Sequence, residues 1–548
     1  MVTVLVVGGV AGGMSAATRL RRLDESANIV IFERGPYVSF ANCGLPYYVG
    51  GVIEERGSLL LQTPAVLAAR FRLDVRVSTE VVAINRPERT VEFRNVLTGE
   101  TGTETYDHVV LAAGAIAVPV GGPSSRALSL RTIDDVDAIT AVLDGAGDAP
   151  TAVVVGGGFI GLEAVDNLVR RGIHTSLIQR GGQLFSPLDH EMSNLVLAEV
   201  QAHGVDVFLG RTVADITDES VLLDDGTEID ADLVIDAAGV HPAVDLASAA
   251  GLRLGSTGGI AVDELHHTSD PRIFAVGDGV EKTDAVDGHP TLVTMAGLAN
   301  RHGRAVADAI AGQPAAAIPA LGTAIIGVFD KTVAVVGWSE KKLVAAGRAH
   351  RVIHTHPASH ATYYPGAEIM AIKLLVDPAR DTILGAQIIG GHGVDKRIDV
   401  IATAMSAGLT ASALKDLELA YAPQYGSAKD PINLIGYVAD NLRRAPGSSV
   451  QWHELADRMA DGAVLVDVRS PAEHRAGHIP GAISMPLEQL RKRHGELEGQ
   501  ALIVHCQVGQ RGHTATSMLS QLGHNVRNLD GGYVTWLAAT RPAKGRTS

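Results

Sequence analysis

The sequence predicts an α/β protein of several domains, in which parallel strands alternate with helices. Two stretches support this, because short apolar strands beginning at Val4 and Ala152 each run into a glycine-rich turn and then a helix. The length of 548 residues exceeds what one hydrophobic core normally serves and indicates about three or four domains.

The composition of the chain limits its function. The net charge is −15 and lysine and arginine form no block, which argues against nucleic acid as the main partner. The two cysteines, Cys43 and Cys506, do not suggest a disulfide framework, so we expect a reducing compartment. Residues 1–7 lack a basic targeting segment, and no apolar run is long enough to cross a membrane. We therefore expect a cytoplasmic enzyme that acts on small molecules and has no membrane partner.

The first glycine-rich turn predicts a dinucleotide site. A strand is expected over 4–7, a helix over 15–23 and a second strand over 28–32. Val10 stands at the second glycine position of G-x-G-x-x-G, so the motif is incomplete. An acid just after the second strand suits ribose hydroxyls, while the glycines let a pyrophosphate approach the helix. The predicted cofactor-binding residues are Gly8, Gly9, Gly12, Gly13 and Glu33; an ordinary βα turn is the alternative.

The second unit matches the motif fully. Strands are expected over 152–155 and 174–178, with a helix to about residue 171 between them. Where an acid would read an unmodified ribose, this unit has Gln179 and Arg180, and Arg180 could pair with a 2′-phosphate unless it is only a surface residue. We expect NADPH to be accepted, with NADH not excluded. The predicted site comprises Gly156, Gly158, Gly161, Gln179 and Arg180.

The difference between the two sites suggests FAD at the first and the nicotinamide cofactor at the second. Apolar strands over 106–114 and 232–239 end in small residues, as is needed where the backbone passes close to a cofactor. A third strand, over 273–278, ends in an acid and indicates that the chain returns to the first fold. Gly114, Gly277 and Asp278 are therefore predicted cofactor-binding residues.

Beyond about Leu321 the chain is rich in strands, and segments 358–366 and 421–431 concentrate tyrosines. On spacing alone such tyrosines are more often surface anchors than catalytic groups. Residues 444–449 have the composition of a linker.

A strand over 501–505 delivers Cys506 into a loop closed by Arg511. Backbone N–H groups and a guanidinium around the sulfur would favour a thiolate and bind anions. Sulfur transfer through a persulfide and phosphate ester hydrolysis both use such a loop. The six-residue span to Arg511, with residues 467–469 and 477–482, resembles rhodanese domains, which transfer sulfur.

Cys43 lies in the run of residues 39–48, directly after the first dinucleotide unit. The common flavin disulfide reductases carry C-x-x-x-x-C, but position 48 is Tyr48, so no internal disulfide can form at that spacing. A single thiol can instead form a mixed disulfide with substrate or a sulfenic acid. Single-cysteine peroxidases and oxidases carry a histidine in the first glycine turn, which this chain lacks.

Residues 1 to about 440 resemble coenzyme A-disulfide reductases, and the whole chain resembles a fusion of such an enzyme with a rhodanese domain. The resemblance rests on residues 8–13, 39–48, 363–366 and 421–431. It implies a homodimer in which Tyr363 and Tyr421 of the partner subunit assist at Cys43. A basic residue expected near position 71 is replaced by Phe71. The implied coenzyme A contacts are Ser15, Arg19, Arg22, Ser39, Asn42 and Lys429.

The fold class expected is thus α/β, with two Rossmann-like dinucleotide-binding domains, an α+β dimerisation domain and a C-terminal rhodanese α/β domain. The boundaries expected are FAD-binding over 1–150 and 240–320, NAD(P)H-binding over 151–239, dimerisation over 321–443, linker over 444–450 and rhodanese over 451–548.

The hypothesis is an FAD-dependent NAD(P)H reductase of coenzyme A disulfide, coenzyme A persulfide and polysulfides, which releases coenzyme A thiol or sulfide. Cys506 and Arg511 would supply sulfane sulfur, and Cys43 would carry the mixed disulfide with coenzyme A. One alternative is an NAD(P)H oxidase or peroxidase that uses a Cys43 sulfenic acid. Another is a sulfur-binding redox sensor.

Overall fold

The computed structural model describes residues 1–120, 126–315 and 318–541. The remaining residues fall within the ranges predicted for the FAD-binding and rhodanese domains and lie outside this description. The chain forms two compact units, each treated separately below. The first unit comprises Met1–Arg180 and Gly204–Gly322, and the second comprises Gly181–His203 and Thr323–Ser548.

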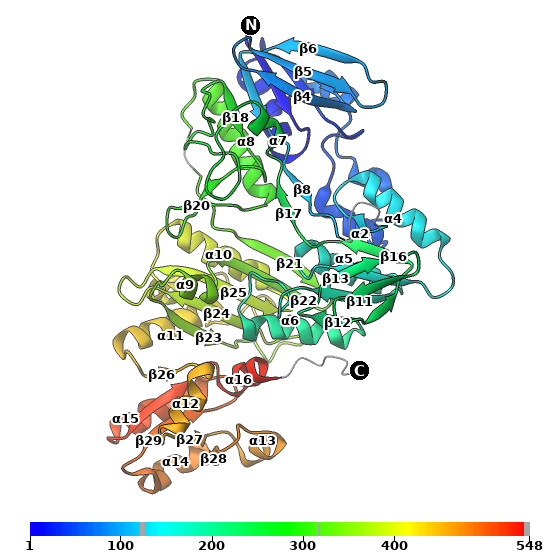
Figure 1. Ribbon diagram of the computed structural model, residues 1–548. Coiled ribbons are helices and arrows are strands. Elements are labelled where there is room, and N and C mark those ends of the chain that lie inside the picture. Colours follow the sequence, from blue (N-terminus) through cyan, green and yellow to red (C-terminus); the bar gives the residue numbers. More distant parts are fainter. Residues whose placement is uncertain (121–125, 316–317, 542–548) are drawn as a thin grey trace. The chain divides into compact units, whose positions relative to one another are not determined.

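The first sheet of the first unit is parallel and has the order β18-β7-β1-β2-β3. Its strand β18 is labelled in Figure 1. Because β18 pairs with β7, the chain returns to this sheet after forming the second glycine-rich unit. The strands are β1 (Thr3–Val7), β2 (Asn28–Phe32), β3 (Asp74–Arg76), β7 (His108–Leu111) and β18 (Ile273–Ala275), and the main helices are α1 (Ala11–Leu23), α3 (Pro64–Phe71) and α8 (Ala296–Ile310).

Helix α1 begins at Ala11, four residues before the predicted start at Ser15. Gly12 and Gly13 are therefore helical, and a Cβ at Gly13 would overlap the carbonyl oxygen of Gly8. The last two glycines of the motif thus belong to the first turn of α1, where the helix packs closely against the glycine-rich turn.

The second sheet of the first unit is also parallel, with the order β12-β11-β10-β16-β9. Helix α5 (Phe159–Arg170) follows its glycine-rich turn. The strands are β9 (Leu128–Ser129), β10 (Thr151–Val155), β11 (His174–Gln179), β12 (Asp206–Leu209) and β16 (Leu233–Asp236).

Smaller elements complete the first unit. They are α2 (Leu45–Val49), α4 (Ile133–Gly145), α7 (Asp245–Ala249) and the strands β4 (Thr79–Asn85), β5 (Thr90–Asn95), β6 (Thr101–Thr105), β8 (Ala115–Ala117), β13 (Val213–Ile216), β14 (Ser220–Leu223), β15 (Glu228–Asp230), β17 (Val240–Pro242), β19 (Lys282–Thr283) and β20 (Pro290–Thr291).

The second unit contains an antiparallel sheet with the order β21-β22-β25-β24-β23. Helix α6 (His190–Ala202), which lies between β11 and β12 in sequence, packs on β21, β22 and β25 of this sheet. The other elements are β21 (Ala324–Val328), β22 (Lys331–Gly337), α9 (Glu340–Ala345), β23 (Arg351–Thr355), β24 (Ala371–Val376), β25 (Ile383–Gly390), α10 (Val394–Ser406) and α11 (Pro431–Arg444).

A parallel sheet with the order β26-β30-β29-β27-β28 follows. The predicted linker over 444–450 is too long, because α11 runs to Arg444 and β26 (Ser449–Val450) is already the edge strand beside β30. The remaining elements are β27 (Val464–Asp467), β28 (Ile483–Ser484), β29 (Ala501–His505), β30 (Asn525–Leu529) and the helices α12 (Leu455–Ala460), α13 (Pro471–Ala476), α14 (Leu487–Arg493), α15 (Gln510–Gln521) and α16 (Gly532–Thr540).

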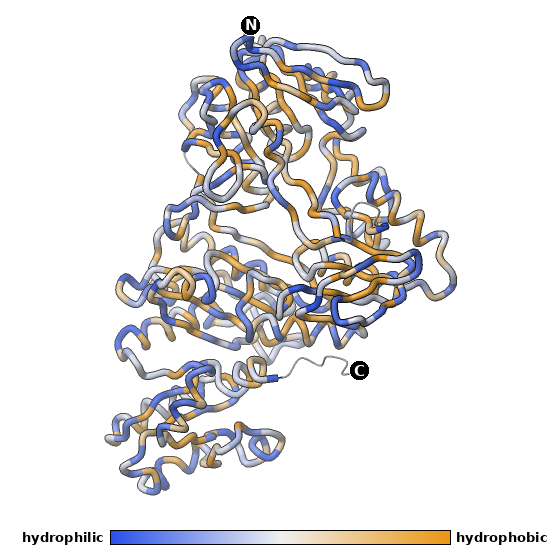
Figure 2. The backbone as a smooth tube through the Cα atoms, viewed as in Figure 1, coloured by the Kyte–Doolittle hydropathy of each residue, from blue (hydrophilic) through white to orange (hydrophobic). Residues whose placement is uncertain are grey.

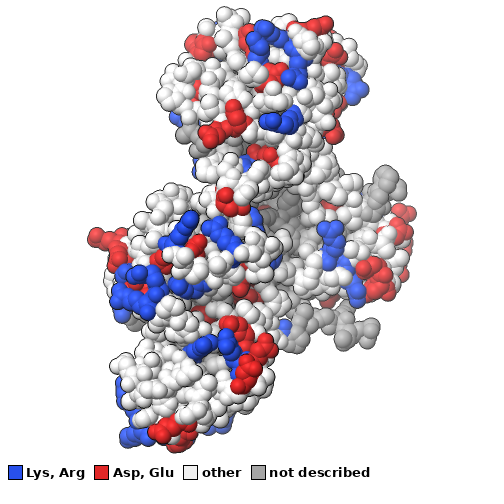
Figure 3. Space-filling view, turned by 60° about the vertical axis from the view of Figure 1, so that its left-hand side comes forward, with Lys and Arg blue, Asp and Glu red and all other residues white. Residues whose placement is uncertain are grey.

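Figure 2 shows that the central strands are largely hydrophobic, as expected for sheets covered on both faces. On the face drawn in Figure 3, basic and acidic side chains are interspersed. Among the described residues, no helix is both long enough and apolar enough to span a bilayer.

Candidate active site

Cys43 lies in the first unit, in the short 3-10 helix Asn42–Gly44 that leads into α2. The residue is exposed. The neighbouring Asn42 donates a hydrogen bond from its side-chain amide to the carbonyl oxygen of Arg131, over 3.2 Å. This bond fixes the segment beside the thiol.

Two carboxylates face Cys43. Burial raises the pKa of the thiol, and the negative charges of Glu163 and Asp278 raise it further. The Tyr47 hydroxyl donates to Glu163 over 3.1 Å, and burial together with Glu163 raises the pKa of Tyr47 to about 12. Sequence reasoning missed Glu163, although its place directly after the second glycine motif was a usable signal.

The two glycine-rich turns are built alike. The backbone N–H of Gly9 donates to the Glu33 carboxylate over 2.8 Å. In the second turn the N–H of Gly157 donates to the Gln179 side-chain oxygen over 2.9 Å. Each turn is thus held by a polar side chain at the carboxyl end of its second strand.

Close backbone packing shows that both turns fit a dinucleotide. Gly8 and Gly156 have φ values of +106° and +111°, and a Cβ at either would overlap a carbonyl oxygen of a neighbouring strand end. Only glycine leaves the backbone open there for a pyrophosphate. Arg180 is exposed and directly follows β11.

Asp278 lies beside a buried lysine. Lys282 donates to the carbonyl oxygens of Gly277 and Val280 over 2.7 and 2.8 Å. Burial lowers the pKa of Lys282 to about 8 and raises the pKa of Asp278. Gly114 and Gly277 have φ values of +74° and +87°, which suit glycine at the two strand ends predicted to meet a cofactor.

The predicted coenzyme A contacts differ in their surroundings. Arg19 pairs with Asp308 over 2.7 Å, whereas Arg22 is exposed. Ser15 donates to the Asn300 carbonyl oxygen over 2.8 Å, and Ser39 is held at a φ of 49°. Arg22 is therefore the more available of the two predicted arginines.

Phe71 ends α3 and packs against the core of the first unit. Its carbonyl oxygen accepts a hydrogen bond of 2.8 Å from the buried Arg21. The neighbouring Arg72 pairs with Glu25 over 3.0 Å. The position of the expected basic contact is thus used for packing.

In the second unit, Tyr363 and Tyr421 lie together. Their hydroxyls are 2.9 Å apart, and the residues are 74% and 49% exposed. Lys429 is also exposed. The two tyrosines come from segments that the sequence singled out separately.

Cys506 directly follows β29 and is buried, with 1% of its surface exposed. Its carbonyl oxygen accepts a hydrogen bond of 2.8 Å from the N–H of Tyr533, and that of Gln507 accepts one of 3.0 Å from Val534. A Cβ at Gly532 would come within 2.5 Å of the Cys506 oxygen. The start of α16 therefore supports the cysteine loop directly.

Arg511 interacts with both Glu473 and Cys506. It donates two hydrogen bonds to Glu473, of 2.9 and 2.6 Å. This pairing and, to a lesser extent, Cys506 raise the pKa of Arg511. Glu473 also caps α13 together with Ser470, and only the sequence spacing of that cap could have drawn attention to it.

A buried charge network stands beside the cysteine loop. Arg469 donates to the Asp467 carboxylate, over 2.8 Å at the shortest, and to the Gln507 side chain over 3.0 Å. Its guanidinium also covers the Tyr533 ring at 4.3 Å. Asp467 and Arg469 belong to the predicted motif. Through Arg469 this ion pair contacts both Gln507 in the cysteine loop and Tyr533 in α16.

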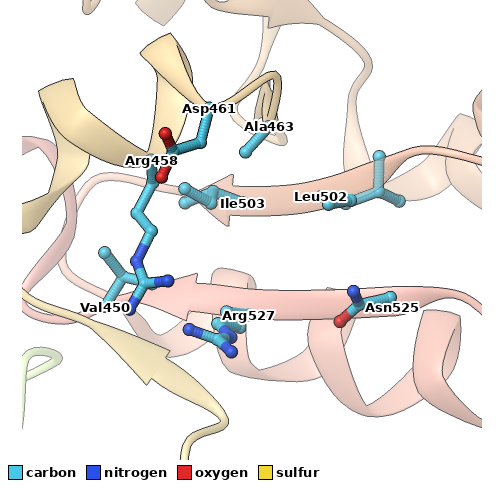
Figure 4. Close-up of a pocket in the computed structure, with 9 residues that line it drawn as sticks. Val450, Arg458, Asp461, Ala463, Leu502, Ile503, Asn525 and Arg527 are labelled. Carbon is cyan, nitrogen blue, oxygen red and sulfur yellow. The ribbon is translucent and has the colours of Figure 1, made fainter.

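The opposite end of this sheet carries a cavity of about 160 Å³ (Figure 4). It lies at the amino ends of β29 and β30, whereas Cys506 follows the carboxyl end of β29. The lining residues are Val450, Arg458, Asp461, Ala463, Ala501, Leu502, Ile503, Asn525 and Arg527.

Two dinucleotide folds, a single thiol after the first and a second thiol in a rhodanese-type loop define a reductase with an added sulfur-handling domain. Family comparison agrees: residues 2–299 match the pyridine nucleotide-disulphide oxidoreductases, 323–430 their dimerisation domain and 451–539 the rhodanese-like domain. The chain belongs to the pyridine nucleotide-disulphide oxidoreductase family. It is an oxidoreductase, and the family implies FAD and NAD(P)H. The predicted fold class is confirmed.

Several known proteins are similar. A coenzyme A disulfide reductase of Staphylococcus haemolyticus is 35% identical over 80% of this chain and 99% of that protein. The structure of reduced Bacillus anthracis CoADR-RHD is 44% identical, covers 98% of both chains and gives a TM-score of 0.95. An NAD-dependent persulfide reductase from A. fulgidus is 35% identical, covers 97% of this chain and 100% of its own, and gives 0.90.

Proposed function

We propose that this protein is an FAD-dependent NAD(P)H reductase of coenzyme A disulfide, coenzyme A persulfide and polysulfides. The observation that carries the proposal is the solitary thiol of the exposed residue Cys43 beside a dinucleotide fold. With tyrosine at position 48, the second sulfur has to come from the substrate. The names of the similar reductases indicate which substrates to test.

Cys43 acts as the nucleophile. Its thiolate attacks one sulfur of coenzyme A disulfide, which forms a mixed disulfide and releases one coenzyme A thiolate. FAD, when bound, supplies the two electrons from NAD(P)H that release the second coenzyme A thiol and restore Cys43. With coenzyme A persulfide, Cys43 attacks the inner sulfur and hydrosulfide leaves instead.

Binding of coenzyme A is assigned to the helix α1 side of the first unit. Arg22 would meet phosphate, and Ser39 and Asn42 would flank the thiol. The contacts proposed in the first unit are Ser15, Arg19, Arg22, Ser39 and Asn42. Lys429, which belongs to the second unit, is a further proposed contact. The exposed pair Tyr363 and Tyr421 would come from the partner subunit of a homodimer, which agrees with the dimerisation domain.

Cys506 supplies sulfane sulfur. Its thiolate takes a terminal sulfur from a polysulfide, becomes a persulfide and releases the shortened polysulfide. A coenzyme A thiolate then attacks the outer sulfur, which frees Cys506 and forms the persulfide that Cys43 reduces. Covalent fusion of the two domains raises the effective concentration of this intermediate.

The experiment is a panel of acceptors with purified holoenzyme, scored by NADPH and NADH consumption and by sulfide release. Cys43→Ser should lower reduction of coenzyme A disulfide by at least about 10³-fold, as expected for loss of a nucleophile. Cys506→Ser should spare that reaction and lower sulfide release from polysulfide in the presence of coenzyme A. Retained disulfide reduction in Cys43→Ser would exclude the mechanism. If wild type consumed NADPH faster with peroxide than with coenzyme A disulfide, the sulfenic acid alternative would be favoured.

A further inference from the structure

Two histidines of the antiparallel sheet contact the segment that supports Cys506. His354 belongs to β23 and His356 directly follows it, so their side chains leave an extended segment on the same face. His354 Nδ1 lies 2.7 Å from the Asp530 carboxylate, and His356 Nε2 lies 2.8 Å from the Thr535 hydroxyl. These two contacts bracket residues 531–534.

The bracketed segment is the one that holds the cysteine loop. Tyr533 and Val534 donate their backbone N–H groups to the carbonyl oxygens of Cys506 and Gln507. A Cβ at Gly531 would lie 2.9 Å from the His354 Cβ. His354 thus packs directly against residues 531–534, which in turn bond to the cysteine loop, and the space at Gly531 has no room for a side chain.

His354 is itself fixed on its other side. Its Nε2 lies 3.1 Å from Glu191 of α6, and Glu191 is also bonded to the buried Lys373 of β24. The His354 backbone N–H donates to Asp530 as well, over 2.9 Å. Asp530 thus accepts two hydrogen bonds from a residue that cannot move independently of the sheet.

We propose that His354 and His356 are positioning residues for Cys506, which hold residues 531–534 so that the cysteine loop keeps the geometry needed for sulfur transfer. The inference rests on the proposed role of Cys506. It assigns part of the rhodanese-like site to side chains that lie outside the rhodanese-like domain.

The charges around these histidines support different roles for them. Groups facing His354 are Glu191, Asp530, Lys373 and His356, and the hydrogen bonds to the two carboxylates outweigh burial and raise the pKa of His354 to about 9. Burial, reinforced by the charge of His354, lowers the pKa of His356 to about 3. At neutral pH a cation holds Asp530 and a neutral ring holds Thr535.

The test measures thiocyanate formation from thiosulfate and cyanide by full-length holoenzyme. Cys506 takes the sulfane sulfur and releases sulfite, and cyanide removes that sulfur as thiocyanate. Reduction of coenzyme A disulfide by the same preparation serves as the internal reference.

His354→Gln and Thr535→Val should each lower kcat/KM for thiocyanate formation about tenfold, the cost of one strong hydrogen bond, while disulfide reduction stays within about twofold of wild type. Thr535→Ser, which restores the hydroxyl, and the exposed control His392→Gln should behave as wild type.

A pH profile separates positioning from a general loss of stability. The advantage of wild type over His354→Gln in thiocyanate formation should disappear as pH rises through about 9, where His354 loses its proton. The inference would be overturned if His354→Gln and Thr535→Val both formed thiocyanate at the wild-type rate, or if they lost thiocyanate formation and disulfide reduction equally. Failure of Thr535→Ser to recover would also overturn it.

Cys506→Ser separates this inference from the proposed function on which it rests. If Cys506→Ser still forms thiocyanate, the proposed role of Cys506 fails. If Cys506→Ser is inactive while His354→Gln is unaffected, only the positioning role fails.

Discussion

Tyr47, which lies one helical turn after Cys43 in the sequence, donates a hydrogen bond from its hydroxyl to the Glu163 carboxylate. Glu163 therefore brings a negative charge next to the thiol. A nearby negative charge opposes ionisation of a thiol, so the charges of the protein itself disfavour the thiolate form of Cys43. This relationship leads to the first prediction.

In Glu163→Gln the pKa of Cys43 should fall, because one of the two charges that oppose thiolate formation is removed. Alkylation of Cys43 by iodoacetamide, followed by mass spectrometry across pH, should show its midpoint at lower pH than in wild type. The exposed Glu264→Gln is the matched control. An unchanged midpoint would contradict the electrostatic account of this site.

Lys373→Met should destabilise the second unit by about 3–5 kcal/mol, since it leaves buried carboxylates without their cation. Lys373 is 0% exposed, and its ammonium lies 2.6 Å from Glu340 and 3.1 Å from Asp189. Chemical denaturation followed by circular dichroism measures the loss. The exposed Lys492→Met should change stability by no more than about 0.5 kcal/mol, and an equal effect of both substitutions would refute the prediction.

Acid should weaken the rhodanese-like domain through Asp467. Hydrogen bonds from Arg469 and His474 and the charge of His505 outweigh burial and lower the pKa of Asp467 from 3.8 to about 2. Its stabilising contribution is therefore fully present above pH 3.8 and is lost as pH falls toward 2. Thermal melts of wild type and Asp467→Asn between pH 6 and 2.5 should converge at the acid end. A constant difference across that range would show that ionisation of Asp467 does not contribute.

Arg180→Ala should raise KM for NADPH by about tenfold and leave KM for NADH nearly unchanged, because a charge-assisted hydrogen bond to phosphate is lost. Steady-state kinetics with both cofactors measure the ratio. The exposed Arg253→Ala provides the control for loss of a surface charge. Parallel changes for the two cofactors would assign Arg180 to the protein surface.

Local patterns were sufficient for much of the fold. The strands Asn28–Phe32 and Ala501–His505 have the bounds that their apolar runs predict, because a buried parallel strand is defined by its own residues. The start of α1 was misplaced, since a glycine-rich turn hides the residues at which the helix begins. Cys43 and Cys506 were evident because cysteine is rare in this chain.

Long-range pairing was not predictable in the same way. Glu163 beside Tyr47, Glu473 beside Arg511 and Lys373 beside Glu191 each join residues from different elements. No periodicity within one segment specifies such a pair, because it depends on how separate elements pack. The sequence around Ser470 indicates that Glu473 caps α13. Its pairing with Arg511 is evident only in the folded chain.

Helix α6 finds its packing partners late during synthesis. Asn194 of α6 donates to the carbonyl oxygen of Ala538 in α16 over 2.9 Å, and His190 lies 3.2 Å from that of Ala539. The side of α6 that meets α16 is therefore covered only after nearly the whole chain has been translated, whereas its contacts with β21, β22 and β25 can form earlier. Until then this side of α6 stays accessible on the nascent chain, and truncation before α16 should leave it open to contacts with other chains.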